Sequence, residues 1–201
     1  MNMTRLFVTL LLTATLCAPA HGASGEFAAA VKGLVDQDRE VMIQSIETLG
    51  RLGDAAALPV LSALLDDAMR IGPQGQALLV TSGGGAVDAI TGEPYSGDVD
   101  ALESPAVNNK VRRALEPALA SLSLASPDPE ARLKAAETLL SGADPELAPV
   151  MEQALAKEKD ARVARKLSLA LALAGLDSPE AGTKISALTA LGRSGDQEQL
   201  V

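Results

Sequence analysis

Side chains that can act as nucleophiles, general bases or zinc ligands are scarce in this sequence. It contains one histidine, His21, and one cysteine, Cys17, both near its N-terminus. A Ser-His-Asp triad, a cysteine nucleophile or a histidine-based zinc site needs such a residue inside the folded domain. Carboxylate pairs stay open as acid–base groups, but most acids stand at predicted helix starts, where they complement the helix dipole. The sequence therefore predicts a protein that is not an enzyme.

Two features of the stretch 68–107 resemble ligand sites. The glycine-rich TSGGGA at 81–86 lacks a following Lys-Ser/Thr and does not open a helix, so it predicts a turn and not a phosphate loop. Four acids of the same stretch are candidates for holding a calcium ion: Asp88, Asp98, Asp100 and Glu103. Their spacing matches no known calcium-loop motif, so solvated loop acids are the favoured interpretation. We expect no cofactor and no metal.

A polar group in and just after this stretch is the candidate interface: Tyr95, Asn108, Asn109, Arg112 and Arg113. Tyr95 lies in GEPYSGDVD, whose Gly and Pro content predicts a loop. The two arginines offer planar hydrogen-bond donors to a partner. The favoured alternative is that at least one of them pairs with a neighbouring acid, such as Glu116 three or four residues further along the same helix, because such surface pairs are common.

The elements that carry these residues repeat along the chain. ETLGRLGDAAALPVL at 47–61 aligns without gaps with ETLLSGADPELAPVM at 137–151, and ALGRSGD at 190–196 matches TLGRLGD at 48–54. Each unit reads as a helix, a tight turn with Gly or Asp, and a second helix. This pattern predicts an all-α fold, a HEAT-like α-solenoid of helical pairs with one inserted hairpin and loop segment. An irregular helical bundle is the alternative.

Apolar periodicity predicts helices at 26–35, 39–50, 55–67, 109–124, 160–175 and 180–192. Within the insertion, the stretches 76–80 and 86–90 predict a hairpin around TSGGG. Pro117 should kink or divide its helix, because it removes a backbone hydrogen bond. The last repeat is incomplete: without a second helix, Ile185, Leu188 and Leu191 would stay exposed. We therefore expect the chain to be a fragment or to be completed by another segment.

Composition and the N-terminus indicate compartment and partner. The net charge of −9 and an aromatic content of 1% exclude a nucleic-acid partner, which needs clustered Lys and Arg and stacking surfaces. Residues 1–20 combine Arg5, an apolar run and Ala18-Pro19-Ala20, the pattern of a signal peptide. An uncleaved membrane anchor is the alternative. We expect an exported, periplasmic helical domain at 21–201.

Several of these stretches together resemble a known family. LGRLGDAAALPVLSALLD, DAITGEP in the Gly-rich insertion, VNNKVRRALEPAL and SPDPEARLKAAETLL are similar to the N-terminal extracytoplasmic region of the urea ABC transporter permease subunit, a branched-chain amino-acid-type permease. The resemblance implies a periplasmic urea-binding protein as partner. It also implies permease and ATPase subunits, reached through a membrane domain that follows this region in the family; with the full permease present, we expect the domain at the periplasmic face of the inner membrane. It supplies no urea-contacting residues.

Two functions follow as expectations. The first is a non-catalytic extracytoplasmic domain of a urea transporter permease, which assists assembly or docks the substrate-binding protein. The alternative is a free-standing periplasmic HEAT-repeat scaffold for protein–protein interaction.

Overall fold

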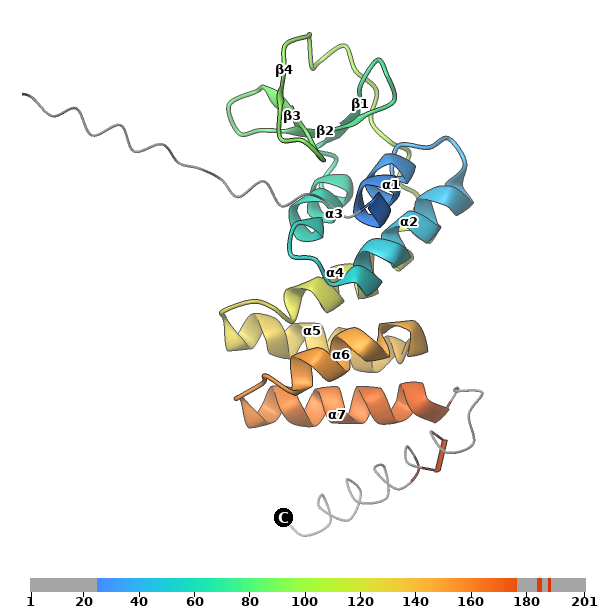
Figure 1. Cartoon of the computed structure of the whole chain (residues 1–201), viewed down its shortest axis with the longest axis vertical. Coiled ribbons are helices and arrows are strands. Elements are labelled where there is room, and N and C mark those ends of the chain that lie inside the picture. The colour runs from blue at the N-terminus through green and yellow to red at the C-terminus, as the bar shows by residue number, and fades with distance from the viewer. Residues whose placement is uncertain (1–24, 177–183, 186–187, 189–201) are drawn as a thin grey trace, which may run out of the picture.

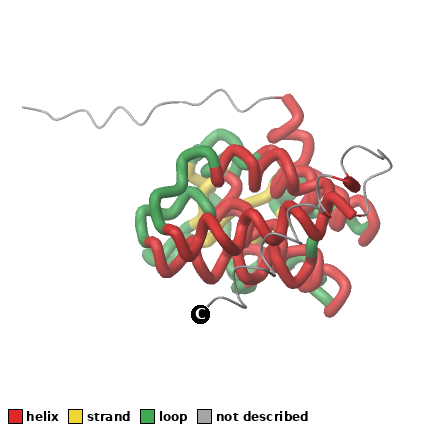
Figure 2. The backbone as a smooth tube through the Cα atoms, turned by 90° about the horizontal axis from the view of Figure 1, so that it is seen from below, coloured by secondary structure: helices red, strands yellow, loops and turns green. Residues whose placement is uncertain are grey.

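The computed structural model describes residues 25–176, 184–185 and 188 and consists of stacked helices with a small sheet at one end (Figure 1). Three helices precede the sheet: α1 (Gly25–Gly33), α2 (Arg39–Leu52) and α3 (Ala57–Leu65). The elements after it are α4 (Asn109–Ser123), α5 (Pro129–Gly142), the 3-10 turn η1 (Pro145–Leu147), α6 (Ala148–Leu155) and α7 (Ala161–Leu176). Seen from the α7 end, the helices overlie one another and the strands lie behind them (Figure 2). The prediction of a mostly helical chain is confirmed.

The turns between the paired helices form where the sequence repeat predicts. Asp54 and its counterpart Asp144 each accept a backbone N–H from two residues ahead, at 2.9 Å. Gly53 ends α2 in the left-handed conformation, with φ 62°, and Ala143 takes the same role after α5, with φ 45°. A left-handed residue at this place satisfies the last carbonyls of a helix. The two aligned stretches, 47–61 and 137–151, therefore share their turn geometry as well as their sequence pattern.

The apolar side chains form two large clusters, joined by α4. The first contains α1, α2 and α3, and it also takes Leu115 and Leu122 from α4. The second is built from α5, α6 and α7, and it also takes Ala120 from α4 and Leu124, the residue that follows α4. Because α4 presents different faces to the two clusters, it holds the two halves of the stack together. None of the described helices is long and apolar enough to cross a bilayer.

The contact between α2 and α4 depends on the absence of a side chain at Gly50. A Cβ built there would lie 2.9 Å from both Cα and Cβ of Ala118, closer than ordinary contacts allow. The buried Ser121 hydroxyl donates a hydrogen bond of 3.0 Å to the Gly50 carbonyl. The two helices therefore approach almost backbone to backbone.

Between α3 and α4 the chain forms a four-stranded antiparallel sheet, ordered β1-β2-β3-β4. Its strands are β1 (Met69–Ile71), β2 (Ala77–Val80), β3 (Ala86–Asp88) and β4 (Pro94–Tyr95). The predicted hairpin is confirmed as β2–β3, with TSGGG as its turn and Gly84 at φ 80°. The loop predicted around Tyr95 is partly wrong, because Pro94 and Tyr95 pair with β3. Proline is tolerated there because β4 is an edge strand.

Two expectations about helices have different outcomes. Pro117 does not divide its helix, since α4 runs from Asn109 to Ser123 with Pro117 inside. The neighbouring Leu115 and Ala118 are both buried, so packing on either side of the proline offsets the lost backbone hydrogen bond. Of the predicted helix at 180–192, the described residues Ile185 and Leu188 are exposed, as predicted. Apart from Lys184, the remainder of that predicted helix lies outside the described residues, as does the predicted signal peptide at 1–20.

Candidate functional site

Arg112 and Arg113 both line a groove between α4 and α5. The groove has two adjoining hollows of about 510 and 440 Å³, which share Glu116, Lys134 and Thr138. The larger hollow takes Arg112, and the smaller takes Arg113. The two helices run antiparallel beside it, since the start of α4 meets the end of α5 at one end of the groove. The candidate arginines therefore belong to a concave surface.

The floor of this groove is apolar and made largely of small side chains. In the larger hollow it consists of Leu65, Leu119, Ala120, Ala131 and Ala135. Leu65 is the last residue of α3, and the others lie on the facing sides of α4 and α5. Alanine at three of these positions leaves room for another backbone to come close to the two helices.

The cationic side chains of the groove have no acidic partner in the described part of the chain. Arg112, Arg113 and Lys134 are exposed, and none of them forms an ion pair with a described residue. The predicted pairing with Glu116 is therefore wrong for both arginines. Solvation and side-chain entropy oppose such a surface pair and leave little net gain from forming it. Their charges remain available to a partner.

Lys134 is the member of the site that sequence reasoning missed. It lies one turn before Thr138 on α5, and both face α4 across the groove. The stretch SPDPEARLKAAETLL predicts a helix, yet nothing in it shows which face meets α4. Only the packing of the two helices brings Lys134 near Arg112.

Asn108 has a structural role that accounts for its place in the sequence. Its side-chain oxygen accepts hydrogen bonds from the backbone N–H groups of Lys110 and Val111, at 2.9 and 3.0 Å, as the N-cap of α4. Asn109 is the first residue of that helix and is exposed. The start of the helix predicted at 109–124 is thus confirmed.

Asn108→Ala is expected to lower the free energy of unfolding by about 1 kcal/mol, because it removes an N-cap. Asn109→Ala, one residue further, should change it by less than about 0.5 kcal/mol, as a surface substitution outside the cap. Denaturant unfolding of the two variants checks both values. Equal losses would contradict the capping role of Asn108.

Tyr95 lies apart from the groove. It lines a different hollow of about 470 Å³ on the sheet, together with Lys32, Asp88 and Glu93. The five candidate residues thus do not form one surface: the arginines share a groove, Asn108 caps the helix that carries them, and Tyr95 belongs to the insertion.

Two of the four acids proposed as calcium ligands serve as turn caps. Asp88 accepts the N–H groups of Ile90 and Thr91, both at 2.8 Å, and Asp98 accepts that of Asp100 at 3.1 Å. Within residues 25–176, 184–185 and 188, no three His, Cys, Asp or Glu side chains are gathered so that they could hold a metal ion.

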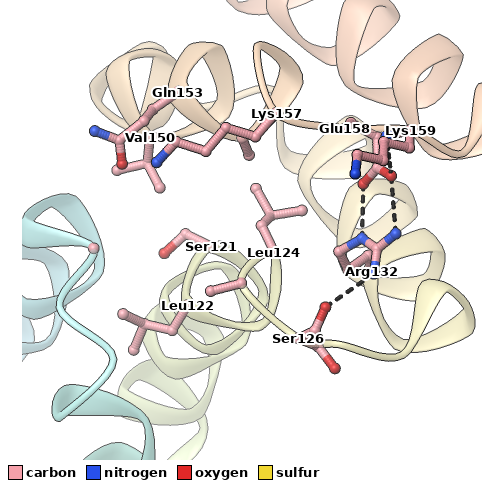
Figure 3. A pocket seen from close by; sticks show the side chains of 13 residues that line it. Ser121, Leu122, Leu124, Ser126, Arg132, Val150, Gln153, Lys157, Glu158 and Lys159 are labelled. Carbon is pink, nitrogen blue, oxygen red and sulfur yellow. Dashed lines mark hydrogen bonds and ion pairs between the residues drawn. The ribbon is translucent and has the colours of Figure 1, made fainter.

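A further hollow, of about 420 Å³, lies on another side of α4 and contains a strong ion pair (Figure 3). Arg132 donates two hydrogen bonds to Glu158, from Nε at 2.7 Å and from Nη2 at 2.9 Å. Its Nη1 donates to the carbonyls of Ser126 and Pro127. Through these bonds Arg132 links the loop before α5 to the loop that carries Glu158. The Glu158 side chain is only 4% exposed, so the pair is largely shielded from solvent. Unlike the groove cations, Arg132 has little capacity left for a ligand.

The hydrogen bonds from Arg132 hold the pKa of Glu158 at about 2, below its ordinary 4.5, and backbone N–H groups of Asp160 and Lys159 act in the same direction. Since the pKa is lowered by folding, the pair stabilises the protein fully above about pH 4.5, and this contribution is lost as the pH falls toward 2. The acid limb of the stability curve should therefore depend on Glu158.

Glu158→Gln is expected to lower the Tm by several degrees at pH 7, because it leaves the Arg132 guanidinium without its carboxylate. The difference from the wild type should narrow as the pH approaches 2, where Glu158 itself becomes protonated. Calorimetry across this range measures the difference. A Tm difference independent of pH would contradict the ion pair as its source.

No family model, curated protein or solved structure matches the chain. What the residues themselves provide is a helical stack with an apolar, cation-lined groove.

Proposed function

We propose that this chain is a non-catalytic docking domain, built as a HEAT-like α-solenoid. The order of the helices supports the solenoid. The helices α2, α4, α5 and α7 follow one another as packed neighbours, and α3 and α6 flank them. Repeated turn geometry at Gly53 and Ala143 also supports it. Stacked helical pairs provide extended surfaces suited to binding other proteins.

The observation that carries the docking function is the α4–α5 groove. It presents three cations without ion-pair partners among the described residues, above an apolar floor, on a chain whose net charge is −9. Here a partner protein would neutralise them and cover the floor, which combines the buried apolar centre and polar rim of ordinary interfaces.

The proposed partner is a periplasmic urea-binding protein, with this chain as the extracytoplasmic part of a urea ABC transporter permease. The support is the set of stretches quoted above, of which VNNKVRRAL forms the start of α4 and so carries the groove arginines. The signal-peptide pattern at 1–20 supports export to the periplasm.

Titration calorimetry with the purified chain and the urea-binding protein of the same organism tests this function. Binding should weaken at least about tenfold in the Arg112→Glu/Arg113→Glu variant, because two attractive contacts become repulsive. Arg165→Glu is the control: it makes one such charge reversal on an exposed residue of α7, outside the groove. Absence of binding by the wild type would refute the proposed partner.

A further inference from the structure

The groove between α4 and α5 has the length and lining to take one helix. Residues 112–123 and 131–142 line it, and about 12 residues of α-helix extend about 18 Å. Its axis runs along both helices, because the two hollows adjoin in this direction. Ala120, Ala131 and Ala135 in the floor have short side chains, so the groove stays open along its middle. A row of side chains from another helix can therefore pack between α4 and α5.

A strand would find nothing to pair with in this groove. Within α4 and α5 the backbone N–H and C=O groups form helical hydrogen bonds except at the helix ends and at the Arg113 carbonyl, which Pro117 leaves without a helical donor; a single carbonyl is not an open row. Addition of a strand requires an open row of such groups, as at a sheet edge. An extended peptide would leave its own backbone groups without partners above an apolar floor, at a cost of about 1–3 kcal/mol for each buried group. A helix satisfies its backbone internally.

The charged side chains at the rim of the groove determine which charge an occupant should carry. Arg112, Arg113 and Lys134 line the groove with two acids, Glu116 and Glu137. The Glu137 carboxylate already pairs with Lys166, with 3.8 Å between Oε1 and Nζ. Among the described residues of the groove, three cations therefore face one unpaired carboxylate, that of Glu116. An occupant with acids along its flanks gains attraction from this surplus, whereas a basic one is repelled.

From shape and charge together, we propose that the α4–α5 groove binds an acidic amphipathic helix of its protein partner. The inference rests on the proposed docking function and specifies the element that docks. One apolar stripe of the helix, with small or medium side chains, lies on the floor. Its Glu or Asp residues flank the stripe and contact Arg112 and Arg113 on α4 and Lys134 on α5.

Peptides provide the probe. The first is a capped peptide of about 14 residues, helical by composition, with a Leu/Ala stripe flanked by Glu. Two others have the same stripe with Gln or with Lys in place of Glu. Titration of the full chain should give the order Glu, then Gln, then Lys, with the Lys peptide at least about tenfold weaker than the Glu peptide. Raising the salt to about 0.5 M should weaken the Glu peptide most.

Variants locate the binding. Arg112→Glu/Arg113→Glu should invert the order of the Glu and Lys peptides, and Arg165→Glu should leave it unchanged. Circular dichroism of each variant checks that the helices are intact. Equal affinities for the three peptides, or an order that the double variant does not alter, would overturn the acidic helix as occupant.

Competition separates this inference from the proposed function. If the urea-binding protein binds the chain and the Glu peptide displaces it, both hold. If that protein binds and the Glu peptide neither binds nor displaces it, the docking function stands and the acidic helix is wrong. If the Glu peptide binds in the expected order and the urea-binding protein does not bind, the inference stands and the partner has been misassigned.

Discussion

Gly50→Val is expected to lower the free energy of unfolding by about 3 kcal/mol, because the new side chain would push α2 away from α4. A Cβ at this position already lies 2.9 Å from the Cα of Ala118, and backbone atoms cannot move aside as a flexible side chain can. Separation of the helices would also lengthen the hydrogen bond from Ser121 to the Gly50 carbonyl. Denaturant unfolding measures the loss.

The matched control is Gly142→Val, at the last residue of α5. A Cβ there meets no atom within 4 Å, so the same chemical change encounters open space. It should alter stability by less than about 0.5 kcal/mol. If the two substitutions had equal effects, the close approach of α2 and α4 would not be the cause, and the packing of the stack around α4 would need revision.

Leu167→Ala should have a comparable effect, a loss of about 3 kcal/mol, because it leaves a cavity in the cluster of α5, α6 and α7. Leu167 is fully buried at 0% exposure. Since the two apolar clusters are distinct, amide exchange should accelerate in α5–α7 more than in α1–α3. Hydrogen-exchange mass spectrometry of the variant resolves the two regions.

Leu169→Ala, at a half-buried position of the same helix, is the control. It should lower the free energy of unfolding clearly less than Leu167→Ala does. A uniform loss of protection across α1–α7 would mean that the chain unfolds as one unit. In that case α4 would couple the clusters fully, and the two halves of the stack would have no separate stability.

The sequence predicts the helices well because their signals are local. Asp38 before α2 and Gly53 after it determine the ends of that helix; Asp128 has the same place before α5, where Ala143 takes the left-handed conformation in place of a glycine. The hairpin β2–β3 is also predictable, since its turn contains three consecutive glycines. Strands β1 and β4 have only three and two residues, too few for any periodicity to be seen.

The groove is predictable only in part. Arg112 and Arg113 stand out in VNNKVRRAL, but their surroundings depend on how α5 packs beside α4, a tertiary contact that no local pattern encodes. Lys134 and the alanine floor enter the site through that contact alone. Pro117 misleads for the same reason: its local effect is to break a helix, and burial of its neighbours on α4 offsets that effect.

Site-specific crosslinking tests the central claim, that the α4–α5 groove is where a protein partner docks, most directly. Thr138→Cys in a Cys17→Ser background places a single photoreactive label in the groove, and Ser168→Cys places one on the exposed side of α7. After irradiation with the urea-binding protein, the label at 138 should crosslink to an acidic helix of that protein, and the label at 168 should not. Crosslinking from 168 without crosslinking from 138 would contradict the claim.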